Sequence, residues 1–167
     1  TPSDAFQRNP QVGFNFSANE SATFECSKDN EAFASCISPL SLSIADGPHN
    51  FQVRATDLAG NIGDPARFDW VTDFVSPVLS FGNITPAQGL SSARSLFVEF
   101  SSNEPSDFTC ALDSQDLTPC ASPFTAPVLS EGQHVFRAQA TDRAGNKSTI
   151  AQAIWDFDFT APIVSLG

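Results

Sequence analysis

The chain has 167 residues, of which 8 are Lys or Arg and 19 are Asp or Glu, so its formal net charge is −11. Nucleic acids and anionic membrane surfaces repel a surface of this charge, and we expect neither as a partner. No apolar run approaches the roughly 18 residues that a membrane helix needs, and no basic segment followed by an apolar one opens the chain, so we expect no membrane insertion and see no signal peptide.

An internal repeat covers nearly the whole chain. Residues 12–26 (VGFNFSANESATFEC) return 84 positions later as residues 96–110 (LFVEFSSNEPSDFTC). Further along, ATDLAGN at 55–61 returns as ATDRAGN at 140–146, now with an offset of 85, because one residue is inserted near Pro127. So many matches in one order indicate two tandem domains of the same kind.

The first domain is predicted to occupy residues 1–75 and the second residues 76–160. Apolar and polar residues alternate in both, as in Val12, Phe14 and Phe16, which is typical of half-buried strands. In chain order, the strands predicted for the second domain are 77–82, 94–101, 106–112, 117–121, 124–129, 134–141 and 150–158. Seven short strands with frequent turns predict an all-β sandwich.

The domains are out of phase with the ends of the chain. Thr1-Pro2 aligns with Thr85-Pro86, so the first domain lacks a counterpart of the strand at 77–82. Residues 161–167 contain PIVSLG, which matches PVLSFG at 77–82 and follows the last strand of the second domain. A fragment of a longer array explains this arrangement, and so does donor-strand exchange, in which this segment fills the gap in another molecule.

The four cysteines form two pairs at the same places in the two copies. We expect the disulfides Cys26–Cys36 and Cys110–Cys120, because a local bond then recurs in each domain. A separation of ten predicts a hairpin with a three- or five-residue loop. Such bonds strengthen small domains and form in oxidising compartments. A redox-active role is disfavoured because neither pair has an adjacent base.

One histidine per domain, His49 or His134, precedes an inward phenylalanine and by alternation points inward. Related sandwiches place a tyrosine here that bonds back to the backbone, and this chain has no tyrosine. We therefore assign both histidines a structural role rather than metal binding or base catalysis. Trp70 and Trp155 lie in alternating strands, which favours core packing over a platform for sugars.

The pattern F-x-C-x-x-D … C-x-S-P … G-x-H-x-F-x-x-x-A-T-D-x-A-G-N … W … D-F-x-x-P resembles the bacterial Ig-like or fibronectin-III-like tandem repeats of large secreted surface proteins. The resemblance covers almost all of both copies. It implies two tandem seven-strand Ig-like sandwiches in an extracellular stalk, spacer or cell-attachment module. The partners it implies are neighbouring repeats, copies of the chain in a fibre, or a cell-surface ligand.

Two other functions compete with this interpretation. A non-catalytic carbohydrate-binding module of a secreted enzyme is the alternative, and exposed aromatic residues on one sheet face would favour it. An enzyme in its own right is the third possibility. The sequence contains no Gly-rich phosphate loop, no G-x-S-x-G and no H-E-x-x-H. We therefore expect no catalytic activity.

A calcium site is a further hypothesis. In a sandwich of this type, two loops of the second domain lie at the pole where the chain enters from the linker. The residues expected to converge there are Asp73, Asn103, Glu104, Asp142 and Asn146. Such oxygen ligands suit Ca²⁺. The motif D-x-A-G-N is also a good turn, with Gly145 at a positive φ, and this turn interpretation stands beside the metal.

Overall fold

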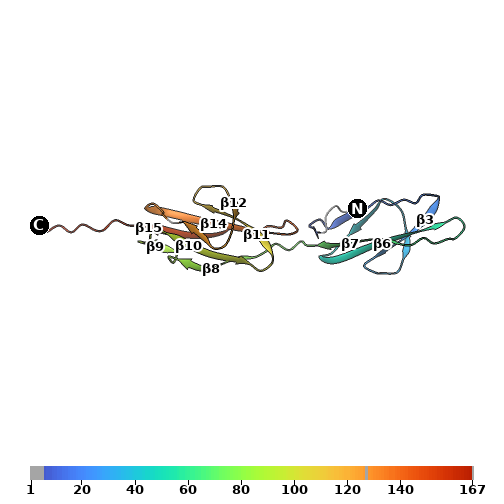
Figure 1. Ribbon diagram of the computed structural model, residues 1–167, viewed down its shortest axis with the longest axis horizontal. Coiled ribbons are helices and arrows are strands. Elements are labelled where there is room, and N and C mark those ends of the chain that lie inside the picture. Colours follow the sequence, from blue (N-terminus) through green and yellow to red (C-terminus); the bar gives the residue numbers. More distant parts are fainter. Residues whose placement is uncertain (1–5, 127, 167) are drawn as a thin grey trace. The chain divides into compact units, whose positions relative to one another are not determined.

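The computed structural model describes residues 6–126 and 128–166 (Figure 1). The chain divides into two compact units, Thr1–Val75 and Ser76–Gly167. The repeat places the domain boundary at the same point, and the segment 161–167 groups with the second unit. The described residues include no helix with the length and apolar character that a membrane crossing requires.

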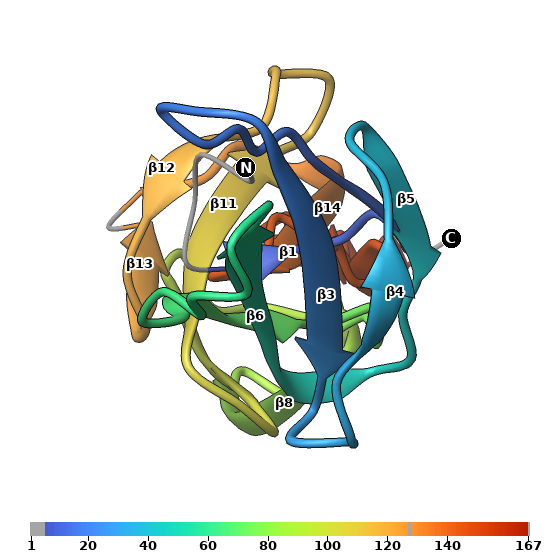
Figure 2. The ribbon, with the colours of Figure 1, turned by 90° about the vertical axis from the view of Figure 1, so that its right-hand side faces the viewer.

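The regular structure in the described part of the first unit consists of strands alone. The strands are β1 (Phe6–Gln7), β2 (Gln11–Phe14), β3 (Ala22–Lys28), β4 (Ala34–Cys36), β5 (Leu40–Ser43), β6 (Gly47–Asp57) and β7 (Ala66–Thr72). The larger sheet has the order β1-β7-β6-β3-β4, and β2 pairs with β5 in a second sheet. Figure 2 shows β3 running between β6 and β4. All pairs are antiparallel except β1 with β7.

The second unit has the same plan with one additional strand, β8. Its strands are β8 (Leu79–Thr85), β9 (Gly89–Ser91), β10 (Leu96–Ser102), β11 (Ser106–Leu112), β12 (Thr118–Cys120), β13 (Phe124–Ala126), β14 (Gly132–Asp142) and β15 (Ala151–Phe157). One sheet has the order β13-β10-β8 and the other β12-β11-β14-β15-β9. The all-β sandwich prediction is confirmed.

One strand of the second unit was missing from the prediction. β9 has only three residues, Gly-Leu-Ser, and it pairs in parallel with β15, with Gly89 opposite Trp155. So short a segment carries no alternation, and a parallel pairing leaves no hairpin signal in the local sequence. β1 takes the same parallel place beside β7 in the first unit. The predicted strand at 124–129 ends at Ala126 as β13, and Pro127 lies outside the described residues.

Each unit packs aromatic rings between its two sheets. In the second unit, the ring of Phe136 lies 4.8 Å from that of Phe124 and 5.8 Å from that of Phe100. In the first unit, the ring of Phe14 stacks on that of Phe51 at 4.0 Å. Trp70 and Trp155 are 3% and 0% exposed, so the prediction that they pack in the cores is confirmed.

Candidate functional site

The cysteines lie on neighbouring strands at one edge of the larger sheet in each unit. Cys26 on β3 is bonded to Cys36 on β4, with Cα atoms 5.8 Å apart. Cys110 on β11 is bonded to Cys120 on β12, with Cα atoms 5.7 Å apart. These are the pairs that the repeat favours, and each encloses a five-residue loop, 29–33 or 113–117.

The turn residues in these loops explain the hairpins. Asp29, Asn30 and Asp113 have φ values of 53°, 62° and 58°, in the left-handed region that Asp and Asn tolerate better than most residues. In the first loop the Glu31 N–H donates to the carbonyl of Lys28 at 2.9 Å. The disulfide then closes a loop whose backbone already turns.

The two histidines bond to the backbone as a corner tyrosine would. Nε2 of His49 lies 2.9 Å from the carbonyl oxygen of Ala45, and Nε2 of His134 lies 3.2 Å from that of Ser130. The acceptor is four residues earlier in both units, so each imidazole fastens the start of a long strand, β6 or β14, to the preceding loop. The predicted bond from each histidine back to the backbone is confirmed.

The sequence reasoning missed the second partner of each histidine. Nδ1 of His49 lies 3.0 Å from Oδ2 of Asp29, and Nδ1 of His134 lies 2.9 Å from Oδ2 of Asp113. The same two aspartates also accept backbone N–H bonds, from Asn50 and Val135, at 3.0 Å. The sequence signal for this contact was that the same Asp and the same His recur together in both copies. A turn needs the Asp but not the His, so their joint recurrence indicates a contact between them.

Contacts in the first unit make Asp29 more acidic. Burial by itself raises the pKa of Asp29, but the hydrogen bonds from His49 and the Asn50 N–H, and the charges of His49 and Lys28, together bring the pKa below its ordinary value. The ionised carboxylate of Asp29, in the loop that follows β3, is thus bonded to His49 and Asn50 near the start of β6. This bond links the disulfide hairpin to the strand beside it.

In the second unit a serine extends the Asp–His pair. Oγ of Ser130 lies 3.3 Å from Nε2 of His134, so Asp113, His134 and Ser130 follow one another as in a hydrolytic triad. Nε2 lies equally near the backbone oxygen of Ser130, at 3.2 Å, and a nitrogen that donates there cannot also accept from the hydroxyl. The first unit has Ala45 at this place and keeps the same backbone bond. The Asp–His pair therefore holds the histidine for its bond to the backbone, and this bond does not depend on the Ser130 hydroxyl.

Four of the five residues in the calcium hypothesis lie in the second unit, on two adjacent turns. Asn103 and Glu104 directly follow β10, and Asp142 is the last residue of β14. A carboxylate oxygen of Glu104 and one of Asp142 lie within 4.8 Å of each other. Two carboxylates at this distance repel each other, and Asp142 is only 8% exposed, so the water that screens such repulsion is restricted.

The hydrogen bonds of these residues show what they already do. Oδ1 of Asn103 accepts the N–H of Val78 at 2.7 Å and so holds the start of the second unit. Oδ1 of Asp142 accepts the N–H of Asn146 at 2.9 Å, and Oδ2 accepts the side-chain amide of Asn146 at 2.8 Å. Gly145 has φ of 90°. The turn interpretation of D-x-A-G-N is therefore confirmed, and calcium at these residues stays a prediction.

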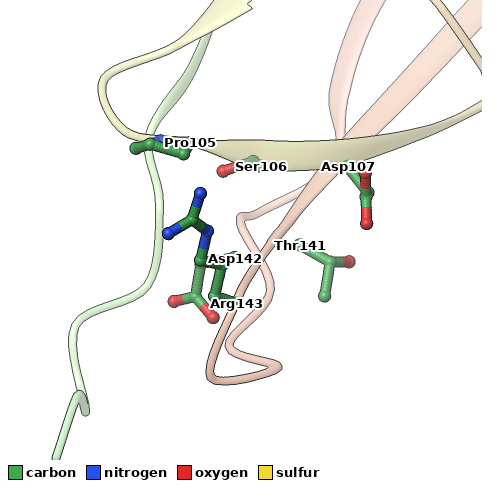
Figure 3. A pocket seen from close by; sticks show the side chains of 6 residues that line it. All are labelled: Pro105, Ser106, Asp107, Thr141, Asp142 and Arg143. Carbon is green, nitrogen blue, oxygen red and sulfur yellow. The ribbon is translucent and has the colours of Figure 1, made fainter. Parts of the chain in front are cut away.

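A pocket of about 330 Å³ opens beside this turn. Figure 3 shows its lining residues, with Pro105, Ser106 and Asp107 on one side and Thr141, Asp142 and Arg143 on the other. Both Asp107 and Asp142 offer carboxylates, while Arg143 brings a positive charge to the same pocket. The first unit has Leu58 where the second has Arg143, so this mixture of charges is particular to the second unit.

Asp73, the fifth residue of the hypothesis, lies in the first unit, just after β7. Its N–H donates to the carbonyl of Gln7 at 2.8 Å, and its Oδ1 accepts the N–H of Val75 at 3.0 Å. The side chain thus shapes the last residues of the first unit. The corresponding D-x-A-G-N turn of this unit has Asp57 bonded to Asn61, with 2.7 Å between Oδ2 and the amide nitrogen.

Several solved structures are similar to the chain at low sequence identity. Fibronectin(III)-like modules of CbhA from Clostridium thermocellum share 13% identity over 91% of this chain and 87% of theirs, with a TM-score of 0.48. A 1.5-MDa bacterial ice-binding adhesin, in a structure concerned with host cell surface retention, shares 13% over 88% of this chain and 58% of its own, with a TM-score of 0.47. An amphioxus IgVJ-C2 molecule shares 14% over 87% and 97%, with a TM-score of 0.43.

No curated protein sequence matches the chain. The match that bears on identity is to a family of sequences. Residues 77–158, which include all the strands from β8 to β15, match the model of the bacterial Ig-like domain. The first unit repeats the strand order of the larger sheet, the disulfide and the bond from histidine to backbone that this segment has. The second unit of this chain belongs to the family of bacterial Ig-like domains.

Proposed function

We propose that the chain is a structural segment of an extracellular bacterial surface protein and acts as a stalk, spacer or cell-attachment module. The observation that carries the proposal is the repetition of one disulfide-strapped Ig-like unit along the chain. Successive copies of one unit extend a chain without requiring a new fold for each step. Disulfides at the same place in both units suit an oxidising, extracellular location.

The carbohydrate-binding alternative has less support. Sugar-binding modules present aromatic rings on an open surface, but both tryptophans here are buried. The net charge of −11 favours solubility of this chain and favours cations as its partners. A passive, acidic spacer agrees with both features.

Two measurements on the same protein separate these functions. Antibodies raised against the chain are expected to label intact cells of the source bacterium, and external protease is expected to remove the label. A glycan array probed with the purified chain is expected to show no binding. Label found only after lysis would refute the surface location, and a specific glycan signal would establish the alternative.

We also propose that the turns of the second unit bind Ca²⁺ through Glu104 and Asp142, with Asn103 and Asn146 close by. Two close carboxylates, one of them buried, support this, because a divalent cation relieves their repulsion and accepts six to eight oxygens in loose geometry. Ligand binding to the folded state alone raises stability by about 2.7 kcal/mol at a concentration one hundred times the dissociation constant. The unit would thereby become stiffer in calcium-rich surroundings.

The test is thermal unfolding with millimolar calcium and with chelator, followed by tryptophan fluorescence. Glu104→Gln is expected to remove the calcium response, because it deletes one charge of the pair and leaves the Asp142–Asn146 turn intact. Glu20→Gln, at the matching position of the first unit, is the control and is expected to retain the response. Asp73→Ala tests the remaining residue of the hypothesis. A midpoint that calcium does not move in the unaltered chain would contradict the proposal.

A further inference from the structure

The disulfide of the first unit borders a cavity of about 210 Å³. Both Cys26 and Cys36 line this cavity, together with Leu40 and Phe51. Every lining residue lies between positions 26 and 51, so strands β3 to β6 and the loops between them form the cavity. A small molecule that enters it therefore meets the disulfide.

The equivalent bond of the second unit is more enclosed. Cys110 is 3% exposed and belongs to the buried cluster of its unit, whereas Cys26 is only partly buried. Both disulfides join cysteines ten positions apart on neighbouring strands. The two bonds thus differ in access from outside and not in the size of the loop that they close.

One substitution between the units accounts for the cavity. Phe124 packs against the buried cluster of the second unit, with its ring 4.8 Å from that of Phe136. The first unit has Leu40 in the place of Phe124, and a leucine fills less space than an aromatic ring. Leu42 is larger than its counterpart Ala126, yet it lines the cavity without closing it.

A positive charge lies at the cavity of the first unit alone. Lys28 lines the cavity, and the second unit has Leu112 at this position. Lys28 follows Cys26 by two positions in β3, so the two side chains share a face of the sheet. Its ammonium lies 3.7 Å from the carboxylate of Asp29, which neutralises part of the charge. A nearby cation stabilises the thiolate that forms when a disulfide opens.

Negative charge decides which thiols can approach the bond. Glu31 also lines the cavity, where the second unit has the neutral Gln115. The whole chain carries a net charge of −11, which adds to the repulsion of anionic reagents. The cavity therefore favours small thiols that carry no negative charge of their own.

We propose that the Cys26–Cys36 disulfide is a site of thiol–disulfide exchange with small, uncharged thiols. A thiolate of the reagent attacks Sγ of Cys36 and forms a mixed disulfide, and the electron pair of the broken bond leaves with Cys26, which takes a proton from water. A second thiolate attacks the mixed disulfide, frees Cys36 and departs as the oxidised reagent. The reagent supplies the nucleophile and both electrons, so the site needs no base of its own. The first unit can thus lose its disulfide while the second keeps its own.

Timed reduction of the folded chain with 2-mercaptoethanol, followed by alkylation and mass spectrometry of the peptides, tests the proposal. The Cys26–Cys36 bond is expected to open about tenfold faster or more than the Cys110–Cys120 bond, because buried cysteines are inert. Its rate is expected not to change with urea below the unfolding transition, because attack occurs on the folded state. Equal rates would overturn the proposal. A rate that rises from the lowest urea concentrations would also overturn it, because unfolding would then expose the bond.

Exchanging the residue that differs between the units sharpens the test. Leu40→Phe is expected to slow the opening of Cys26–Cys36, and Phe124→Leu to speed the opening of Cys110–Cys120, with urea unfolding as the check that both variants fold. If Leu40→Phe overpacks the core and does not fold, Phe124→Leu decides alone, because it only removes volume. Unchanged rates in the folded variants would show that the cavity does not control access.

The charges are tested with a matched pair of reagents. The anionic 2-mercaptoethanesulfonate is expected to open Cys26–Cys36 more slowly than 2-mercaptoethanol, after each rate is divided by that for a neutral small-molecule disulfide. Glu31→Gln is expected to narrow this difference, and Lys28→Gln to slow both reagents. Equal normalised rates with the unaltered chain would overturn the preference for uncharged thiols.

Discussion

The two units share one repeated sequence, yet they bury their cores to different extents. Eleven residues form the buried cluster of the second unit, against five in the described part of the first. Phe100, Ala138 and Ala153 are 4% exposed or less, whereas their counterparts Phe16, Val53 and Phe68 are only partly buried. All three counterparts line an apolar hollow of about 180 Å³ beside β2, which Phe14 and Phe51 also line. These three positions are thus more buried in the second unit, where β8 pairs with β10.

The first unit fills part of this space with larger side chains. It has Phe14 where the second unit has Val98, and Phe68 where the second has Ala153. The ring of Phe14 contacts that of Phe51 at 4.0 Å and that of Phe68 at 6.2 Å. Aromatic pairs of this kind add stability beyond the area that they bury. The two units thus reach a packed core by different combinations of strand and side chain.

The largest expected difference between the units concerns their central phenylalanines. Phe136→Ala is expected to cost the second unit about 3–5 kcal/mol, since the ring is fully buried among three others. Phe51→Ala is expected to cost the first unit less, because this ring borders an existing hollow. Urea unfolding measures both, with Trp155→Phe and Trp70→Phe backgrounds so that the remaining tryptophan reports one unit. A larger loss in the first unit would reverse the comparison.

The disulfides are expected to contribute alike in the two units. Replacing both cysteines of a pair with alanine is expected to cost about 2–3 kcal/mol, because each bond closes a loop of the same size. With the smaller buried cluster, the first unit is expected to reach a lower urea midpoint than the second after this loss. Mass spectrometry of unreduced peptides comes first, and free thiols or a bond between the units would contradict the pairing.

Acid is expected to weaken the first unit through Asp29. The pKa of Asp29 is lower in the folded chain than its ordinary value, so the unfolded state binds the proton more readily. The stabilisation is therefore complete above the unfolded pKa of about 3.9 and is lost as the pH falls through the folded value. Asp29→Asn is expected to flatten the dependence of the Trp70-reported unfolding midpoint on pH below about 4. An unchanged slope would show that the His49 contact contributes nothing.

The smallest expected effect is that of Ser130. Ser130→Ala gives the second unit the residue that the first has at Ala45, and the histidine bond to the backbone remains available. The change in the free energy of unfolding is expected to lie within about 0.5 kcal/mol. Ala45→Ser is the reciprocal variant. A decrease of more than about 1 kcal/mol in the free energy of unfolding of Ser130→Ala would show that the hydroxyl contact with His134 stabilises the unit after all.

Sequence reasoning reached the strands with hairpin connections and the paired cysteines, because both recur at fixed offsets. It missed β9, whose three residues pair in parallel with a strand more than sixty residues away. It assigned Asp29 and Asp113 to turns but missed their bonds to His49 and His134. Each of those bonds joins a hairpin loop to a neighbouring strand. The local sequence pattern does not indicate which side chain on that strand faces the loop.

The sequence by itself determined the number of units, their alternating strands, the disulfide positions and the likeness of residues 162–167 to β8, because repetition and a period of two are properties of the chain alone. Only the tertiary structure decided that β2 stops at Phe14 and that a hollow adjoins it. A strand needs a partner to satisfy its backbone groups, so the same pattern of residues extends in β10, beside β8, and ends early in β2.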